Sequence, residues 1–170
     1  DNHLTGSIPA ELGQLSNITL LYFEKNEFSG SIPLELGNLS HLNYLELANN
    51  QLTGSIPPEL GRLSELERLS LFNNFLSGSI PPEIGNMSSL AQLYLYGNSL
   101  TGSIPAELAE LNNLRECVLW GNQLSGVVPE ALREHPCWET NWHLILHQNN
   151  HGISYEGLEI YAPEFSVKTI

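Results

Sequence analysis

A spacing of 24 residues runs through the first 132 residues of this chain and constrains its fold more than any other feature. Glycine and asparagine each recur once per period, glycine at Gly6, Gly30, Gly54, Gly78, Gly102 and Gly126, and asparagine at Asn2, Asn26, Asn50, Asn74, Asn98 and Asn122. An Ile-Pro pair keeps the same phase through five periods, with Val128-Pro129 as its last member. Self-similarity at such a period is typical of solenoids, propellers and arrays. Because a stacked repeat grows by copying units, the fold has to be derived from one repeat.

Residues 42–65, with the sequence LNYLELANNQLTGSIPPELGRLSE, represent the unit. Leu45 and Leu47 lie two positions apart, so on a short strand both side chains point to one face. Tyr44 and Glu46 then point to the other face. The leucine side has to be buried, and the same frame recurs in the neighbouring repeats. We therefore expect strands that stack in register as a parallel sheet, with rungs about 4.8 Å apart.

The return from each strand to the next carries its own signals. Asn50 stands where the chain leaves the strand, and its amide can pair with turn backbone groups that would otherwise be buried unpaired. Gly54 is expected to need positive φ or a close backbone approach, and Pro57 suits the first turn of a short helix. An acidic row then falls near successive helix N-termini, where the macrodipole favours an anion by about 0.3–1 kcal/mol: Glu11, Glu35, Glu59, Glu83 and Glu107. We interpret this row as structural, not as a metal or catalytic site.

The pattern LxxLxLxxNxLtGsIPxeLgxL resembles the plant-type, 24-residue leucine-rich repeat of receptor-kinase ectodomains and polygalacturonase-inhibiting proteins. The resemblance covers residues 1–132, as five to six units. It implies an α/β fold, a right-handed solenoid shaped as a curved horseshoe, with a parallel sheet on the concave face and short 3-10 or α turns on the convex side. It also implies a second short strand at the LtGsI step. Recognition in this family usually uses the variable positions of the concave strands.

Ligand-binding residues are expected where the repeat stops repeating, on the outward positions of these strands. The candidates are Tyr22, Tyr44, Glu46, Arg68, Phe72, Tyr94, Tyr96 and Trp120. Phe72, Tyr96 and Trp120 share one phase, so they should form a column with neighbours one rung apart. Exposed aromatic side chains are typical anchors for a ligand, because they supply large rigid contact surfaces. The alternative is that these rings only stack and stiffen the sheet.

Composition and motifs exclude several function classes. The net charge of −13 argues against nucleic acid or an anionic membrane as the main partner, because both need clustered Lys and Arg. No run approaches 18 apolar residues, so we expect no membrane insertion in this segment. No nucleophile–base pair, phosphate loop or dinucleotide fingerprint occurs in the repeats, and we predict no enzyme activity, no cofactor and no metal site. The chain enters in mid-repeat, which indicates that further repeats precede it.

The leading hypothesis is a non-catalytic recognition module, extracellular or on a cell surface, that binds a protein, peptide or glycan on its concave aromatic face. Two alternatives stay open. The chain could be the targeting or interaction domain of a larger multidomain enzyme, or a structural, adhesin-like spacer. An ice-binding surface is disfavoured, because it would need a flat, repetitive array rich in Thr, and these columns are irregular.

The repeat template fails after Leu132. We predict a capping segment over residues 133–151, in which Trp138 and Trp142 cover the last open rung, and a tail or linker over residues 152–170. A metal site made of His143, His147 and His151 would require a helix. The segment around Leu144-Ile145-Leu146 favours a strand instead, so we do not predict that metal site.

The two cysteines of the chain fall near this cap. Cys117 replaces an inward leucine and is expected to be buried, and whether it pairs with Cys137 is left open. The plant-type family commonly closes with a paired-cysteine cap, and this sequence departs from that pattern. The stretch HPCWETNWHLIL resembles instead the ends of such repeats in surface proteins of Bacteroidetes-type bacteria.

Overall fold

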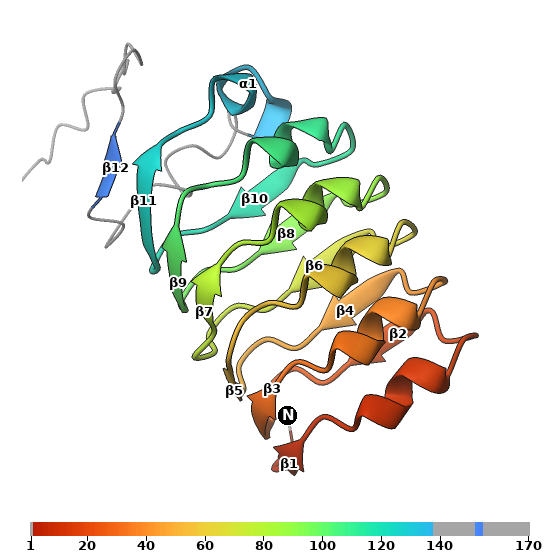
Figure 1. Ribbon diagram of the computed structural model, residues 1–170. Coiled ribbons are helices and arrows are strands. Elements are labelled where there is room, and N and C mark those ends of the chain that lie inside the picture. The colour runs from red at the N-terminus through yellow and green to blue at the C-terminus, as the bar shows by residue number, and fades with distance from the viewer. Residues whose placement is uncertain (1, 138–151, 155–170) are drawn as a thin grey trace, which may run out of the picture.

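Five short strands form the parallel sheet that the spaced leucines predict. They are β2 (Leu20–Tyr22), β4 (Tyr44–Glu46), β6 (Arg68–Ser70), β8 (Gln92–Tyr94) and β10 (Glu116–Val118), side by side in the order β10-β8-β6-β4-β2. Each residue pairs with the residue 24 positions further on, so Leu45 lies beside Leu69. The computed structural model describes residues 2–137 and 152–154, and Figure 1 shows the coils stacked along one curved axis. The predicted register and parallel direction are confirmed.

A second row of strands lies at the LtGsI step, as the resemblance implies. One sheet contains β1 (Thr5–Ser7), β3 (Glu27–Ser31) and β5 (Gln51–Thr53), and the next contains β7 (Ser77–Ser79), β9 (Ser99–Gly102), β11 (Gln123–Val127) and β12 (Gly152–Ser154). The Ser77 N–H donates to the Gly54 carbonyl at 2.8 Å, so backbone hydrogen bonding continues between the two sheets. Gly54 has the positive φ expected of it, +77°. β12, from the segment predicted as a tail or linker, pairs in parallel with β11.

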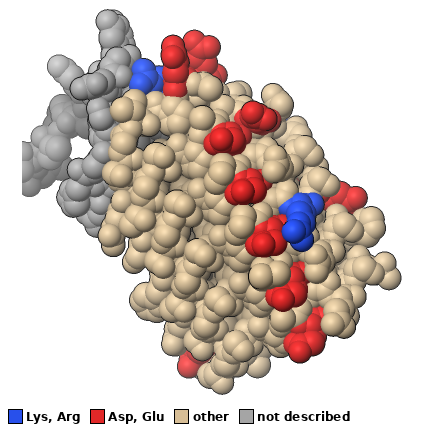
Figure 2. Space-filling model, viewed as in Figure 1, with Lys and Arg blue, Asp and Glu red and all other residues tan. Residues whose placement is uncertain are grey.

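Short 3-10 turns carry the chain back along the convex side. They are η1 (Ala10–Gln14), η2 (Leu34–Asn38), η3 (Pro58–Arg62), η4 (Pro82–Asn86) and η5 (Ala106–Glu110), and the α-helix α1 (Glu130–Arg133) takes the corresponding place in the last coil. Pro57 is the N-cap of η3 and not part of its first turn, as had been expected, because its extended backbone at ψ 129° precedes the turn. Its carbonyl accepts the Leu60 N–H at 3.1 Å. The acidic row lies in the first turn of each 3-10 segment and follows the turns across the face seen in Figure 2.

The first four turns each pack so closely on the following turn that one position in them requires glycine. A Cβ placed on Gly61 would lie 2.3 Å from the Glu83 carbonyl oxygen of the next turn. Gly13 and Gly37 meet the following turn at the same distance, and Gly85 at 2.5 Å. The absence of a side chain at this position therefore sets the spacing of the convex side.

The repeated asparagines pair the backbone where each strand ends. Asn50 accepts the Phe28 N–H through Oδ1 at 3.0 Å, and its Nδ2 donates to the carbonyls of Leu47 at 3.0 Å and Phe23 at 2.9 Å. Asn74, Asn98 and Asn122 make the corresponding bonds in their own coils. Each asparagine thus joins its own coil to the preceding one, and the structural role predicted for this row is confirmed.

The core is a continuous column of leucine and isoleucine between the two rows of strands and the turns. The inward residues of a central coil are fully buried, among them Leu45, Leu47, Leu60, Leu63 and Leu66. Full burial of one such side chain contributes about 1.5–3 kcal/mol. Because every coil packs only on the coils above and below it, this column holds the concave sheet at a fixed curvature and positions its outward side chains.

Candidate ligand-binding face

An aromatic column extends the C-terminal half of the concave sheet, from residues that lie two positions beyond the ends of β6, β8 and β10 and not within the strands, as had been expected. The ring centroids of Phe72 and Tyr96 lie 4.4 Å apart with an angle of 8° between the rings, and those of Tyr96 and Trp120 lie 4.6 Å apart at 21°. The rings therefore stack face to face at about the spacing of the rungs. All three are half-buried, and burial raises the pKa of the Tyr96 hydroxyl, which stays neutral. The preceding rung has Ala48 in this phase, so the column begins at Phe72.

Beside the column, polar side chains from four neighbouring strands form one hydrogen-bonded network. Arg68 donates through Nε to Gln92 Oε1 at 2.5 Å and lies 3.3 Å from Glu46 Oε1 through its Nη1. Gln92 donates through Nε2 to Glu116 Oε1 at 3.1 Å and to the Tyr94 hydroxyl at 3.0 Å. The Tyr94 hydroxyl in turn donates to Glu116 Oε2. One guanidinium thus sits between two carboxylates, and the network as a whole is anionic.

The protonation states of this network are set by its own contacts. Burial and the hydrogen bond to Glu116 raise the pKa of Tyr94. The same bond from Tyr94, together with that from Gln92, lowers the pKa of Glu116. Tyr94 therefore remains a neutral donor and Glu116 an anion across the physiological range, so the face keeps a fixed pattern of charge.

The N-terminal end of the face is more open. Tyr22 and Tyr44 have ring centroids 6.5 Å apart in a tilted arrangement, and the Arg68 guanidinium lies 5.6 Å above the Tyr44 ring. The Tyr44 hydroxyl donates to Glu67 at 3.1 Å, and this bond raises the pKa of Tyr44. Arg68 therefore links the tyrosine pair to the polar network.

The eight residues predicted as a site divide between the column, the network and the tyrosine pair. Glu46 differs from the expectation for an outward residue, because it is only 5% exposed and its carboxylate is paired with Arg68. The prediction omitted Gln92 and Glu116, although they continue the phase of Arg68 at intervals of 24 residues. Their position in the repeat was the sequence signal that could have identified them as neighbours of Arg68. The outward Ser70, 1% exposed, has a hydroxyl with no hydrogen-bond partner among the described residues.

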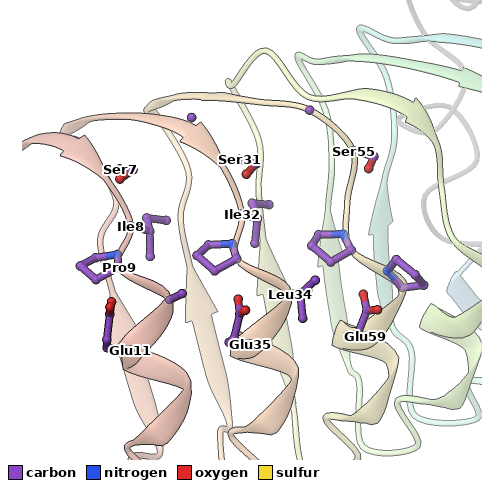
Figure 3. Close-up of a pocket in the computed structure, with 16 residues that line it drawn as sticks. Ser7, Ile8, Pro9, Glu11, Ser31, Ile32, Leu34, Glu35, Ser55 and Glu59 are labelled. Carbon is purple, nitrogen blue, oxygen red and sulfur yellow. The ribbon is translucent and has the colours of Figure 1, made fainter.

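A different surface lies on the flank formed by the second row of strands. Hydroxyl side chains stand before and after the glycine in the first five LtGs steps, and most of them are exposed, as in Thr5 and Ser7 or Thr53 and Ser55. Beside them runs a groove of about 950 Å³, bordered by the prolines that cap the turns and by the carboxylates of Glu11, Glu35 and Glu59. In Figure 3 the labelled serines and carboxylates repeat from coil to coil in parallel rows. These regular rows lie on the flank, whereas the irregular columns that argued against ice binding lie on the concave face.

The repeat itself identifies the family. A family model described as Leucine Rich Repeat matches residues 17–39, 41–63, 65–87, 89–111 and 113–134. The chain belongs to the leucine-rich repeat family. A search of curated protein sequences finds no significant match to this leucine-rich repeat chain.

Solved structures similar to this leucine-rich repeat chain include plant receptor ectodomains. The Arabidopsis receptor kinase HAESA, in complex with the peptide hormone IDA and the co-receptor SERK1, is 38% identical over 92% of this chain and 26% of its own, with a TM-score of 0.80. A TDR receptor is 44% identical over 79% of this chain and 23% of its own, with a TM-score of 0.78. A plant ice-binding protein is 35% identical over 79% of this chain and 44% of its own, with a TM-score of 0.75.

The repeat chain spans only part of these proteins, from 16% to 26% of the receptor chains that it matches. Within residues 2–137 and 152–154, no group of three or more His, Cys, Asp or Glu side chains could hold a metal ion. No helix in that part of the chain has the length and apolar character needed to cross a membrane. The predicted cap residues Trp138 and Trp142, the His143, His147 and His151 set, and most of the stretch that resembles bacterial surface proteins lie outside the described residues.

Proposed function

We propose that this chain is a non-catalytic recognition module whose concave face binds an extended segment of a peptide or protein. The observation that carries the proposal is the half-buried aromatic column beside a network with fixed charges, both on the concave sheet. The similar receptor ectodomains support it, since HAESA is described in complex with a peptide hormone. They also support an extracellular or cell-surface location, because one is described as the ectodomain of a plant membrane receptor kinase.

The geometry of the column favours a peptide over a glycan. The rings cover one another face to face, so Tyr96 has its faces occupied and presents mainly its edge to a ligand. Aromatic edges and the gaps between them accept aliphatic or proline side chains. The two centroid separations of 4.4 and 4.6 Å give a column of about 9 Å. An extended peptide advances about 3.3 Å per residue, so roughly three residues would lie along it.

The neighbouring network would orient that peptide. Arg68 is the one cation of the network and can accept a ligand carboxylate beside its own partners. Glu116 offers an anion on the other side of Gln92, for a basic side chain or an amide N–H. Charged groups at fixed positions beside apolar anchors give register to an extended ligand.

The test is a screen of the immobilised full chain against a random peptide library and a glycan array, followed by a triple variant of the column. We expect selective peptide binding. Phe72→Ser, Tyr96→Ser and Trp120→Ser together should weaken the selected peptide at least about 30-fold, the loss of one strong aromatic anchor. Phe75→Ser is the matched control, because Phe75 is an aromatic residue that is 62% exposed but lies outside the column.

Circular dichroism must show that the triple variant is folded. A folded triple variant with unchanged peptide affinity would eliminate the aromatic column as the binding site. Selective binding to glycans alone would reverse the choice of ligand class. If neither the peptide library nor the glycan array gives a selective ligand, the result favours a structural, adhesin-like spacer.

Ice binding is a second candidate function, favoured by the regular hydroxyl rows on the flank. Exposed Ser and Thr repeat there on a sheet whose rungs are about 4.8 Å apart, and a plant ice-binding protein is among the similar structures. The assay is inhibition of ice recrystallisation. A Thr53→Lys, Thr101→Lys variant should lose inhibition while the concave triple variant keeps it. Absence of inhibition by the unmodified chain would remove this candidate.

A further inference from the structure

A buried cluster of two thiols and an imidazole closes the C-terminal end of the described core. Cys117 is the inward residue of β10 and is 3% exposed, and Cys137, which follows α1, is 1% exposed. His135 takes the position that Leu111 holds one repeat earlier, and it is 7% exposed. A leucine position occupied by an imidazole needs partners for both ring nitrogens, because a buried polar group without a hydrogen bond is costly.

Both nitrogens of His135 have such partners. Nε2 lies 3.1 Å from the Leu111 carbonyl oxygen, which can only accept, so Nε2 carries the hydrogen. Nδ1 is then the free acceptor of a neutral ring. It receives the Cys137 backbone N–H at 3.3 Å and lies 3.1 Å from Cys137 Sγ. The imidazole is thereby fixed in the tautomer that can take the proton of the Cys137 thiol.

The two thiols are hydrogen-bond partners and are not equivalent. The hydrogen bond from Cys117 lowers the pKa of Cys137 to about 7, and the hydrogen bond and electrostatic interaction with His135 act in the same direction. The same bond and burial raise the pKa of Cys117. Among the described residues, Cys117 and His135 are the titratable groups that act on Cys137. Cys137 is therefore the thiol that ionises first, and Cys117 is the donor that stabilises its thiolate.

We propose that Cys137 is a reactive thiol and that its oxidation by a low-molecular-weight disulfide joins it to Cys117, fastening the chain after α1 to the last described strand of the concave sheet. In the structure both cysteines are free thiols. A simple packing role would require only a small apolar side chain at each position. It would not explain an oriented histidine whose acceptor nitrogen faces one sulfur.

The reaction balances with oxidised glutathione as the oxidant. The Cys137 thiolate attacks one sulfur of glutathione disulfide, the S–S bond of the reagent breaks, and one glutathione leaves and takes up a proton. Cys117 then loses its proton and attacks the Cys137 sulfur of the mixed disulfide. The second glutathione leaves as its thiol, so the protein loses two hydrogens and the reagent gains two. His135 can hold the proton that Cys137 releases.

The experiment treats the full reduced chain with oxidised glutathione under native conditions, quenches with acid, blocks remaining thiols with N-ethylmaleimide and measures intact mass. The wild type should carry neither glutathione nor maleimide. Cys117→Ser keeps a donor beside Cys137 but cannot close the disulfide, so it should accumulate one glutathione. Cys137→Ser should remain unmodified for much longer, because the Cys117 thiol has a raised pKa.

The outcomes separate the proposal from mere burial. Two maleimide labels on folded wild type, under conditions in which denatured chain oxidises fully, would overturn it. So would equal rates of glutathione addition to the two single-serine variants. The bonded form should also have a higher Tm than the reduced form, and a lower Tm would contradict a fastening role.

His135 is a positioning residue in this reaction, and its test is a pH profile. The rate of Cys137 modification in Cys117→Ser should rise with a midpoint close to pH 7, the pKa of about 7 that the contacts give this thiol. Adding His135→Asn should move the midpoint upward and slow the reaction near neutral pH by about threefold or more, after allowance for the greater nucleophilicity of a more basic thiolate. An unmoved midpoint in a folded variant would remove His135 from the mechanism. If His135→Asn does not fold, the pH profile of Cys117→Ser with His135 intact decides. A midpoint of Cys137 modification above about pH 8 would then also remove His135 from the mechanism.

Discussion

Replacing Asn74 with alanine is expected to destabilise the chain by about 2–4 kcal/mol. Asn74 is 6% exposed. Its Oδ1 is the acceptor for the Leu52 N–H at 3.0 Å, and its Nδ2 donates to the carbonyls of Leu47 and Leu71, each at 3.1 Å. The variant removes these three bonds and leaves a small space that alanine cannot fill. It also removes a long bond from Nδ2 to the Phe72 carbonyl at 3.4 Å, but that carbonyl keeps the Asn49 N–H at 2.9 Å.

The magnitude depends on which of these groups keeps a second partner. The Leu47 carbonyl also accepts from Asn50 at 3.0 Å, and the Leu71 carbonyl also accepts from Asn98 at 3.1 Å. The Leu52 N–H has no such substitute in the described structure. One fully orphaned buried donor costs about 1–3 kcal/mol, and each lost second bond to a carbonyl adds about 0.5 kcal/mol. The orphaned Leu52 N–H and the two lost second bonds together give the expected loss of about 2–4 kcal/mol.

Asn26→Ala is the matched control, because Asn26 holds the same position in an end coil. It accepts the Leu4 N–H at 3.2 Å at an exposed site, where water can replace the amide. We expect it to cost less than about 1 kcal/mol. Urea unfolding followed by circular dichroism measures both variants. Equal losses of stability in the two variants would refute this reasoning, and so would a loss below about 1 kcal/mol for Asn74→Ala. Either result would mean that the Leu52 N–H finds another partner when Asn74 is removed.

Three further perturbations test other parts of the fold. Gly61→Ala places a Cβ 2.3 Å from the Glu83 carbonyl oxygen. The substitution should lower the free energy of unfolding by about 1–3 kcal/mol and lower the Tm. An unchanged Tm would mean that the turns can separate freely. Ser70→Ala removes a buried hydroxyl that has no partner among the described residues. The free energy of unfolding should therefore stay equal or rise by up to about 1 kcal/mol. A clear loss of stability in urea unfolding would show that the hydroxyl makes a hydrogen bond. Tyr94→Phe removes the hydrogen bond that lowers the pKa of Glu116. Such a carboxylate stabilises the folded state above its unfolded pKa, and this contribution is lost as pH falls through the folded pKa. The Tm difference between Tyr94→Phe and wild type should therefore shrink as the pH falls below about 4.5, the ordinary pKa of a glutamate. A difference that does not change with pH would contradict this explanation.

The periodic residues made the fold predictable from sequence, because each of them has one possible environment. Leu45 and Leu69 can both leave water only if their strands stack, and a 24-residue period in parallel register makes them neighbours. The same logic predicted that Phe72 and Tyr96 would stack, since side chains one period apart meet on a sheet. Periodicity thus determines which side chains are adjacent, on the outer face as well as in the core.

Periodicity does not determine how far an outward side chain is exposed. Glu46 has the same direction as Tyr22, yet it is 5% exposed where Tyr22 is 56% exposed. The difference comes from the length and charge of the neighbours, because Arg68 reaches back one rung to pair with Glu46. The network through Gln92 arises in the same way, from long side chains that bridge rungs. Such contacts depend on rotamers, which the repeat pattern leaves open.

One methyl group distinguishes the coil in which the regular repeat changes. The close-packed glycine of the convex turns is replaced in the fifth turn by Ala109, whose position corresponds to Gly61 and Gly85. A Cβ at those glycines would lie within 2.5 Å of the next turn's backbone, so a turn that follows Ala109 cannot approach as closely. The structure has the α-helix α1 there in place of a further 3-10 turn. The core beyond that point is closed by His135 and Cys137, residues that the 24-residue template does not contain. Loss of the glycine therefore precedes the loss of the leucine pattern by one coil, and the thiol cluster occupies the place where the regular stacking ends.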